Sequence, residues 1–291
     1  MNQTSGHVSA IGPEADASFR SRLWPLLVLL VAYVLNFIDR QILGVLAVPI
    51  KADIELTDSE LGLVGGVAFA LFYSTLGVPI ARIADRANRV KIVAACCFIW
   101  SLFTAACGTA QNFLHLFLAR VGVGIGEAGY GAPCYSLIPD FFPPKWRARA
   151  FAIFQFGIPI GAALGVFFGG WLAASVGWRL AFVVVGLIGL PVSAVIWFFV
   201  REPTRGGLDG TDFQPAATTV PFKAVLARLA ITPSFWLLTL GASCSALQMY
   251  GLMFWLPSLF KRSFGLSLTE LSLYFGSILL AGGLAGRIEP K

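Results

Sequence analysis

The stretch Trp24–Ile50, WPLLVLLVAYVLNFIDRQILGVLAVPI, decides the fold class of this chain. It is longer than the roughly 20 apolar residues that a transmembrane helix needs, yet Asp39 and Arg40 lie inside it. Each charge costs roughly 2.5–3.5 kcal/mol at a lipid-facing helix centre, so both must face other protein groups or a water-filled cavity. The stretch therefore predicts a membrane-spanning helix that contributes charges to a protected interior.

The composition of the whole chain is that of a membrane protein. Of its 291 residues, 57% are hydrophobic and 12% are charged, and the mean hydropathy is +0.78. Soluble domains carry about 25% charged residues, so these values exclude a disordered chain, a collagen-like repeat and an ordinary cytosolic enzyme. We predict an all-α, polytopic membrane protein.

Apolar run lengths predict eight spans. They are Trp24–Ile50, Leu61–Ile80, Ile92–Ala110, Phe113–Ile138, Ala150–Ser175, Trp178–Val200, Ser234–Leu256 and Leu271–Gly286. These spans divide the chain into a disordered cytoplasmic tail (1–23), an N-terminal six-helix bundle (24–200), a central cytoplasmic linker (201–233) and an incomplete C-terminal bundle (234–291). Within the linker, Pro221–Leu229 favours a short surface helix.

Lysine and arginine residues are distributed unequally between the loops. With the N-terminus inside, fifteen of them fall on the cytoplasmic side, and four fall outside: Lys51, Arg179, Lys261 and Arg262. The net charge of +6 therefore reflects membrane topology and not a nucleic-acid-binding surface. We expect a multi-pass protein of the plasma membrane, in a bacterium the inner membrane, with a cytoplasmic N-terminus.

A weak internal repeat predicts two related halves. The capping-box pattern Thr57-x-x-Glu60 precedes the second span, and Ser267-x-x-Glu270 precedes the eighth. The seventh and eighth spans thus restart what the first and second began, as in transporters built from parallel repeats. If the second half copied the first, four further helices would follow, so we expect the chain to be truncated.

Four charged residues fall deep within the predicted spans, away from the span ends, and they predict a single polar site. Asp39 and Arg40 lie in the first span, and Arg120 and Glu127 lie in the fourth. At 100° per residue, Arg120 and Glu127 are about 20° apart on one helix face. Counted from the middle of each span, all four charges fall within about 10 Å of the same depth.

The neighbours and the chemistry of these charges favour a functional cavity. Tyr33, Asn36 and Arg40 share one helix face, whereas Asp39 points about 100° away from Arg40. A desolvated carboxylate is readily protonated, and a guanidinium binds phosphate or carboxylate through two hydrogen bonds. The alternative is a structural ion pair that only joins the two helices, although burial offsets much of the attraction in such a pair.

Glycines at every fourth position mark the fifth predicted span. Gly157, Gly161, Gly165 and Gly169 form a smooth stripe along one face of the helix. Small residues at this spacing allow helices in membranes to approach closely. We therefore expect this stripe to serve packing and nothing more.

The cysteines and histidines argue against a metal site. The five cysteines lie in apolar stretches without ligand-like spacing, and the two histidines, His7 and His115, are distant from them in the sequence. We expect buried, inert thiols, no metal and no cofactor other than a coupling proton. The spans also contain no histidine cluster, Ser/Lys dyad or metal-spaced acids that would indicate an intramembrane enzyme.

Three motifs and one loop resemble the major facilitator superfamily and, within it, the Spinster-like transporters. The motifs are Asn36-Phe37-x-Asp39-Arg40, Arg120-x-Gly122-x-Gly124-x-Gly126-Glu127 and Gly177-Trp178-Arg179. The loop Ala81–Lys91 resembles the signature loop of the superfamily, with Ala81 and Asn88 where that loop has glycines. Spinster-like members show the form Asp85-Arg86-x-Asn88-Arg89.

The resemblance implies a fold, a mechanism and residue roles. The expected fold is the major facilitator fold, with a complete N-terminal six-helix bundle and the first two helices of the C-terminal bundle. The expected mechanism is proton-linked alternating access by a monomer for an anionic or lysolipid-like solute. The implied roles are substrate binding by Arg40, Arg120, Asn36 and Tyr33, proton coupling by Asp39 and Glu127, and gating by Asp85, Arg86, Asn88 and Arg89.

Two other functions remain open from the sequence. An organic-anion:proton symporter for sugar acids shares the Asp-Arg and Arg…Glu pattern, although Asn88 in place of glycine favours the Spinster-like interpretation. A non-transporting scaffold or truncated fragment belongs to a different class, and the missing helices are its best support. An enzyme is a distant third.

Overall fold

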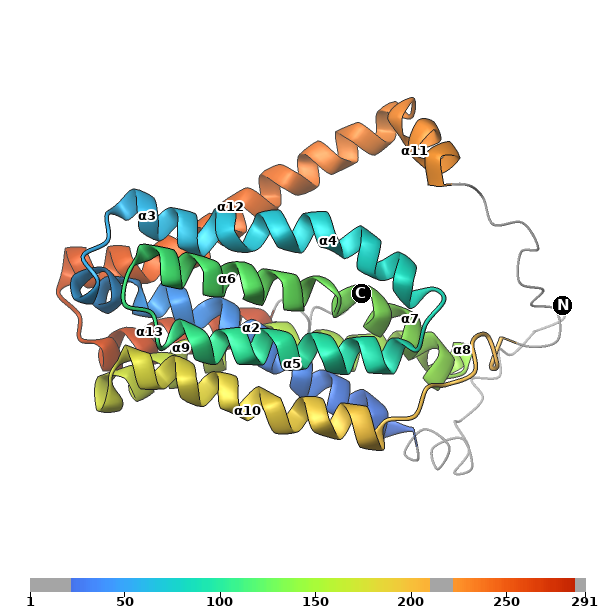
Figure 1. Cartoon of the computed structure of the whole chain (residues 1–291), viewed down its shortest axis with the longest axis horizontal. Helices are drawn as coiled ribbons and strands as arrows, with labels where there is room; N and C mark the ends of the chain where they lie inside the picture. Colours follow the sequence, from blue (N-terminus) through green and yellow to red (C-terminus); the bar gives the residue numbers. More distant parts are fainter. Residues whose placement is uncertain (1–21, 210–221, 286–291) are drawn as a thin grey trace, which may run out of the picture.

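The computed structural model describes residues 22–209 and 222–285, and every regular element in these residues is a helix (Figure 1). The elements of the first six predicted spans are α2 (Leu23–Asp53), α3 (Asp58–Gly62), the π-helix η1 (Leu63–Val67), α4 (Ala68–Ala84), α5 (Arg89–Cys107), α6 (Phe113–Ala128), α7 (Gly131–Phe141), α8 (Pro144–Gln155), α9 (Gly157–Val176) and α10 (Trp178–Phe199). After them come α11 (Phe222–Ala230), α12 (Pro233–Phe264) and α13 (Leu268–Ala285).

Among the described residues, six helical stretches are long and apolar enough to cross a membrane. They are Leu23–Asp53, Asp58–Ala84, Arg89–Cys107, Pro144–Val176, Trp178–Phe199 and Pro233–Phe264. The other two predicted spans correspond to the α6–α7 pair and to the shorter apolar helix α13. The all-α membrane fold predicted from the sequence is thus confirmed. The predicted tail 1–23 falls almost entirely on residues that lie outside the described ones.

Two of the predicted spans differ from the structure, one because of a tertiary contact and the other because of a glycine cap. The fourth span is not continuous, because a turn at Gly129-Tyr130 separates α6 from α7. This turn buries Tyr130, whose hydroxyl donates a hydrogen bond to the carbonyl of Leu29 on α2. The seventh span does not end near Pro257. Instead, α12 continues to Gly265, whose positive φ of 64° closes the helix with a hydrogen bond to the Lys261 carbonyl.

The glycine stripe of α9 packs closely on another helix, as the sequence predicts, and the structure shows that this helix is α2. A Cβ atom at Gly161 would overlap the side chain of Phe37, and one at Gly165 would lie 3.0 Å from the Cα of Ile38. The opposite face of α9 contacts α13, where Gly170 and Gly276 leave room for neighbouring side chains. The helix α9 therefore joins the first half of the chain to α13.

The remaining helices complete the bundle by packing on one another and on α10. Helix α5 packs between α6 and α10, and α4 packs against α6. The bundle has two ends that we name by their helices: the α3 end, which includes the α12–α13 loop, and the α8 end, which includes the α4–α5 loop (Figure 1). Helix α12 lies close to α3 at one end and departs from the bundle toward α11 at the other (Figure 1). This arrangement leaves most of α12 exposed in this chain.

Candidate functional site

Helices α2 and α6 bring the four membrane-embedded charges together in two ion pairs. In the first pair, Arg40 Nε donates a hydrogen bond to Glu127 Oε2 at 2.7 Å. The Glu127 side chain is 0% exposed and that of Arg40 is 13% exposed. A short, charge-assisted hydrogen bond of this kind is strong. Because Arg40 is partly exposed, a ligand is still able to reach its guanidinium.

The second pair is looser and more deeply buried. Arg120 Nη1 lies 3.7 Å from Asp39 Oδ1, and both side chains are 2% exposed. Neither carboxylate oxygen of Asp39, nor Nε and Nη1 of Arg120, has a hydrogen-bond partner among the described residues. Buried polar atoms without partners are costly, so this carboxylate is the member of the group that a proton would satisfy best.

Aromatic side chains surround the Arg40 guanidinium. Its Cζ lies 5.2 Å from the ring centroid of Phe37, and 4.9 Å from those of Phe69 and Tyr73. From α12, the Tyr250 hydroxyl accepts a hydrogen bond from Arg40 Nη1 at 3.4 Å. The site therefore consists of the Arg40 guanidinium, three aromatic rings around it and Tyr250 from α12, in the last third of the chain. The sequence analysis missed Phe69, Tyr73 and Tyr250, because aromatic residues on apolar helices carry no signal of their own.

Two further predicted binding residues lie on the same helix but in different surroundings. Asn36 is 1% exposed, and its Nδ2 has no hydrogen-bond partner among the described residues. The Tyr33 ring stacks on Phe154 at 4.4 Å between centroids, and on Tyr130 at 5.8 Å. Asn36 thus has an unused donor inside the bundle, whereas Tyr33 belongs to an aromatic cluster with Tyr130, in the turn before α7, and Phe154 of α8.

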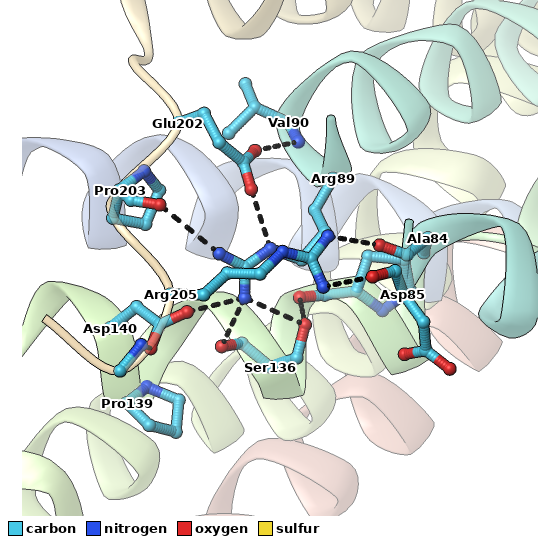
Figure 2. A network of polar contacts seen from close by, with 12 residues as sticks. Ala84, Asp85, Arg89, Val90, Ser136, Pro139, Asp140, Glu202, Pro203 and Arg205 are labelled. Carbon is cyan, nitrogen blue, oxygen red and sulfur yellow. Dashed lines mark hydrogen bonds and ion pairs between the residues drawn. The ribbon is translucent and has the colours of Figure 1, made fainter. Parts of the chain in front are cut away.

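The four predicted gating residues separate into two groups at the α8 end. Arg89 is buried, and its guanidinium lies between Glu202, Asp140 and the Ser136 carbonyl at 2.7, 2.5 and 3.0 Å (Figure 2). Asn88 caps α5 by accepting a hydrogen bond from the Lys91 N–H at 2.8 Å. Asp85 and Arg86 have exposed side chains in the α4–α5 loop. Asn88 is exposed as well, so of the four only Arg89 is buried, and Asp85 and Arg86 are the exposed charges.

The segment after α10 is part of this network, which the sequence analysis did not foresee. Arg205 donates hydrogen bonds to the carbonyls of Ala84, Asp85 and Ala87 at 2.6, 2.6 and 2.9 Å, and so caps the C-terminus of α4 (Figure 2). Glu202 accepts from the Val90 N–H at 2.9 Å and caps the N-terminus of α5. The sequence signal was a pair of opposite charges, Glu202 and Arg205, directly after a span.

The cysteines form no site in the part of the chain that the structure describes. Four of them, Cys96, Cys97, Cys107 and Cys134, are buried, and Cys244 is exposed. Among the described residues, no group of three or more His, Cys, Asp or Glu side chains is placed so that it could hold a metal ion.

Buried, paired charges inside a bundle of membrane-length helices are typical of multi-pass membrane proteins that move substrates or protons. The family follows from comparison with known proteins: the model of the Major Facilitator Superfamily matches residues 29–291. The chain belongs to this superfamily, a family of transporters and not of enzymes.

Curated relatives support the predicted Spinster-like resemblance. An MFS-type efflux pump of Mycolicibacterium smegmatis is 32% identical over 95% of this chain and 66% of its own length. Protein spinster homolog 1 of Homo sapiens is 32% identical over 82% of this chain and 46% of its own length. The chain thus spans about half to two thirds of the length of these relatives.

Solved structures show the same fold. A bacterial homologue of the human lysosomal transporter Spinster, in an inward-facing and unoccupied conformation, matches with a TM-score of 0.81 and 37% identity. Its inward-facing and occupied conformation matches with a TM-score of 0.78 and 36% identity. The matches cover 90% of this chain and 60% and 59% of those chains. The predicted major facilitator fold is therefore confirmed.

Proposed function

We propose that this chain provides the coupling half of a secondary active transporter that works by alternating access. The observation that carries the proposal is the pairing of four buried charges across α2 and α6, with both oxygens of Asp39 unbonded to described residues. Placing charges inside a membrane bundle costs free energy, and proteins that retain such charges use them to bind substrates or to carry protons. Transport is a property of the whole protein. This chain covers 66% and 46% of the lengths of two relatives, so the activity of the whole protein is part of the proposal.

Asp39 is the proposed proton carrier, with Glu127 as its partner. Protonation of Asp39 would remove a buried charge that lacks hydrogen bonds and would release Arg120 from its weak ion pair. The second carboxylate, Glu127, stays bound to the Arg40 guanidinium through its shorter hydrogen bond of 2.7 Å. Proton binding and the arrangement of the two guanidinium groups are thereby linked.

Arg40 is the proposed first contact of an anionic or amphipathic, lysolipid-like solute, and Arg120 is the second. Arg40 is the more accessible guanidinium and is framed by Phe37, Phe69 and Tyr73. A cation beside aromatic rings suits a molecule with an anionic head group and an apolar tail. Asn36, with a free buried donor, and Tyr33 complete the proposed binding set.

We propose an orientation with the α8 end and the N-terminus in the cytoplasm of a plasma membrane, in a bacterium the inner membrane. The distribution of Lys and Arg between the loops supports it. Asp85 and Arg86 then face the cytoplasm as gating residues, positioned by the Arg89 and Arg205 network. The same proposal treats 24–200 as the N-terminal bundle, 201–233 as the central linker and 234–291 as part of a C-terminal bundle, in a monomer.

Uptake into proteoliposomes tests the proposal. The chain is reconstituted, a pH gradient is imposed, and uptake of a labelled lysophospholipid is compared with that of a sugar acid. We expect lysophospholipid transport that depends on pH, loss of this dependence in Asp39→Asn, and loss of transport in Arg120→Ala. Glu60→Gln, in an exposed capping box at the α3 end, is the control with unchanged transport.

The alternatives correspond to distinct results of the same assay. Saturable sugar-acid uptake that Arg120→Ala abolishes would replace the lipid substrate with a sugar acid. Unchanged pH dependence in Asp39→Asn would discard the proposed proton carrier. A chain that inserts and folds but transports neither solute would favour the non-transporting scaffold.

A further inference from the structure

Helices α5 and α10 leave an apolar groove between them on the surface of the bundle. The two helices pack against each other, and in Figure 1 they lie side by side with α10 along the lower edge of the view. The groove has a volume of about 510 Å³, within the range of about 300–1,000 Å³ that is typical of ligand pockets. Only residues of α5 and α10 line it, and none of them belongs to the proposed solute-binding set.

The spacing of the lining residues places the groove on one face of each helix. On α5, Ala94, Ala95 and Phe98 follow Lys91 by three, four and seven residues, so these four residues share a face. The α10 side of the groove has the same helical spacing, with Leu190, Ser193, Ala194, Trp197 and Phe198. Lys91 therefore lies where the groove approaches the α8 end of the bundle.

The dimensions of the groove suit one acyl chain of a lipid. From Leu190 to Phe198 the groove follows about 12 Å of helix, which is close to the roughly 15 Å of hydrocarbon in one leaflet. Ala95 and Ala194 contribute little volume to its lining, whereas Phe98 and Phe198 are large and are 49% and 76% exposed. The groove is thus apolar, accessible from the side of the bundle and about one leaflet deep.

Two cations lie near the α8 end of this groove. Lys91 is exposed, and its Nζ lies 5.6 Å from the centroid of the Trp197 ring. Arg201 follows Phe198 by three residues, directly after α10, and is exposed as well. Lysine, arginine and tryptophan side chains are typical of the membrane interface, where lipid head groups begin.

The charges of these two cations are not neutralised within the described part of the chain. Neither Lys91 nor Arg201 forms an ion pair there, in contrast to Arg89 and Arg179. The carboxylate of Glu202 follows Arg201 in sequence, but one of its oxygens accepts from Arg89 Nε and the other from the backbone N–H at position 90. The positive charge beside the groove is therefore available to an external anion.

We propose that the groove between α5 and α10 binds an anionic phospholipid, with its phosphate at Lys91 and Arg201 and one acyl chain along the groove. Basic residues at the end of a cleft between membrane helices recognise anionic head groups. A zwitterionic lipid brings a cation of its own to the same residues and should bind less tightly. The proposal does not depend on transport, and the leaflet follows from the orientation of the α8 end.

Lipid retention by the purified protein tests this site. The full chain is purified in a mild detergent, stripped of native lipid and titrated with phosphatidylglycerol, or with phosphatidylcholine that has the same acyl chains. Native mass spectrometry measures the fraction of protein that retains one added lipid, and so the Kd. We expect a Kd at least about 5-fold lower for phosphatidylglycerol, because a single basic residue near the head group contributes about 1 kcal/mol.

Substitutions at the groove change the two affinities in different ways. Lys91→Gln and Arg201→Gln each raise the Kd for phosphatidylglycerol about 5-fold and leave that for phosphatidylcholine nearly unchanged. Lys91→Arg keeps the charge and should retain the parent affinity. Ala194→Leu fills the space of the acyl chain from an exposed position, so it should raise the Kd for both lipids.

Two matched controls separate this site from general attraction of lipids to the protein. Lys145→Gln removes another exposed lysine at the α8 end, whose Nζ lies 5.9 Å from the ring of Trp146 on α8. Ala174→Leu enlarges an exposed alanine of α9 outside the groove. We expect neither control to change the Kd for phosphatidylglycerol. Thermal unfolding without lipid verifies that each variant is folded.

Several results would overturn the proposed lipid site. Equal affinity of the parent chain for the two lipids, or an unchanged Kd in Lys91→Gln and Arg201→Gln, would exclude recognition of the anionic head group. Equal effects of Ala194→Leu and Ala174→Leu would exclude the groove as the place of the acyl chain. Loss of phosphatidylglycerol on addition of millimolar inorganic phosphate would show a site for a soluble anion in place of a lipid.

Discussion

At the residue scale, the two buried ion pairs differ in how well each charge is satisfied. Glu127 accepts a hydrogen bond of 2.7 Å from Arg40, whereas Asp39 has only Arg120 at 3.7 Å among the ion pairs of the described residues. Neutralising the carboxylate therefore removes a different interaction in each pair. Protonation of Asp39 removes a weak ion pair, whereas protonation of Glu127 leaves the Arg40 guanidinium without its carboxylate acceptor.

This difference predicts unequal effects on stability. Glu127→Ala leaves Arg40 without its buried partner and should lower the free energy of unfolding by about 3 kcal/mol. Asp39→Asn leaves Arg120 without a carboxylate, but the ion pair that is lost is longer, at 3.7 Å, and the amide keeps a polar group of the same shape, so we expect a smaller loss. Unfolding in detergent, followed by the fluorescence of a dye that labels the buried cysteines as they become exposed, measures both. Equal losses in the two variants would contradict the difference between the pairs.

At the element scale, α9 is the helix that connects the parts of the chain. One face carries the glycine stripe against α2, and the other face packs on α13. In a membrane, association of helices depends on close van der Waals packing, because lipid tails are as apolar as the side chains. The absence of side chains in the stripe thus sets the distance between α2 and α9.

A methyl group in this stripe should weaken the bundle. Gly161→Ala places a Cβ atom on the backbone of Val34 and the side chain of Phe37, and should cost about 1–3 kcal/mol. Gly241→Ala in α12 makes the same change where no atom lies within 4 Å, so stability should not fall. Thermal unfolding of both variants in one detergent compares them. A loss in Gly241→Ala as large as in Gly161→Ala would indicate that packing on α2 is not the cause.

At the scale of the whole molecule, the segment 201–209 belongs to the first six spans in structural terms. Glu202 and Arg205 cap α5 and α4, and Glu202 also pairs with the buried Arg89. Asp140 joins the same network by accepting from the Gly206 N–H at 2.9 Å. The linker predicted as one region therefore begins with a part that is bound to the bundle.

Truncation at two points should show this boundary. A fragment 1–209 retains the network, whereas a fragment 1–200 leaves Arg89 without Glu202 and α4 without its cap. We expect the shorter fragment to be less stable by about 1–3 kcal/mol, because Arg89 keeps Asp140 but loses Glu202, and α4 and α5 lose their caps. Size-exclusion chromatography and thermal unfolding in detergent provide the measurement. Fragments of equal stability would show that the segment contributes nothing to the bundle.

The sequence predicted the class of protein, the spans and the motifs because these depend on local patterns. Hydropathy and run length identify membrane helices, and the spacing of charges on a helix places them on a face. The same patterns placed Asp39, Arg40, Arg120 and Glu127 in spans. Errors occurred at Gly129-Tyr130 and beyond Pro257, where tertiary packing and a glycine cap decide the helix boundaries.

The sequence by itself therefore determined that this is a multi-pass membrane protein of the major facilitator type with charges in its interior. Only the tertiary structure decided which charges pair, that Phe69, Tyr73 and Tyr250 frame Arg40, and that α12 closes on the first half at the α3 end. The physical reason is that hydropathy and helical periodicity act within one helix. Pairing, framing and closure depend on which faces of different helices meet, and residues far apart in the sequence set that arrangement.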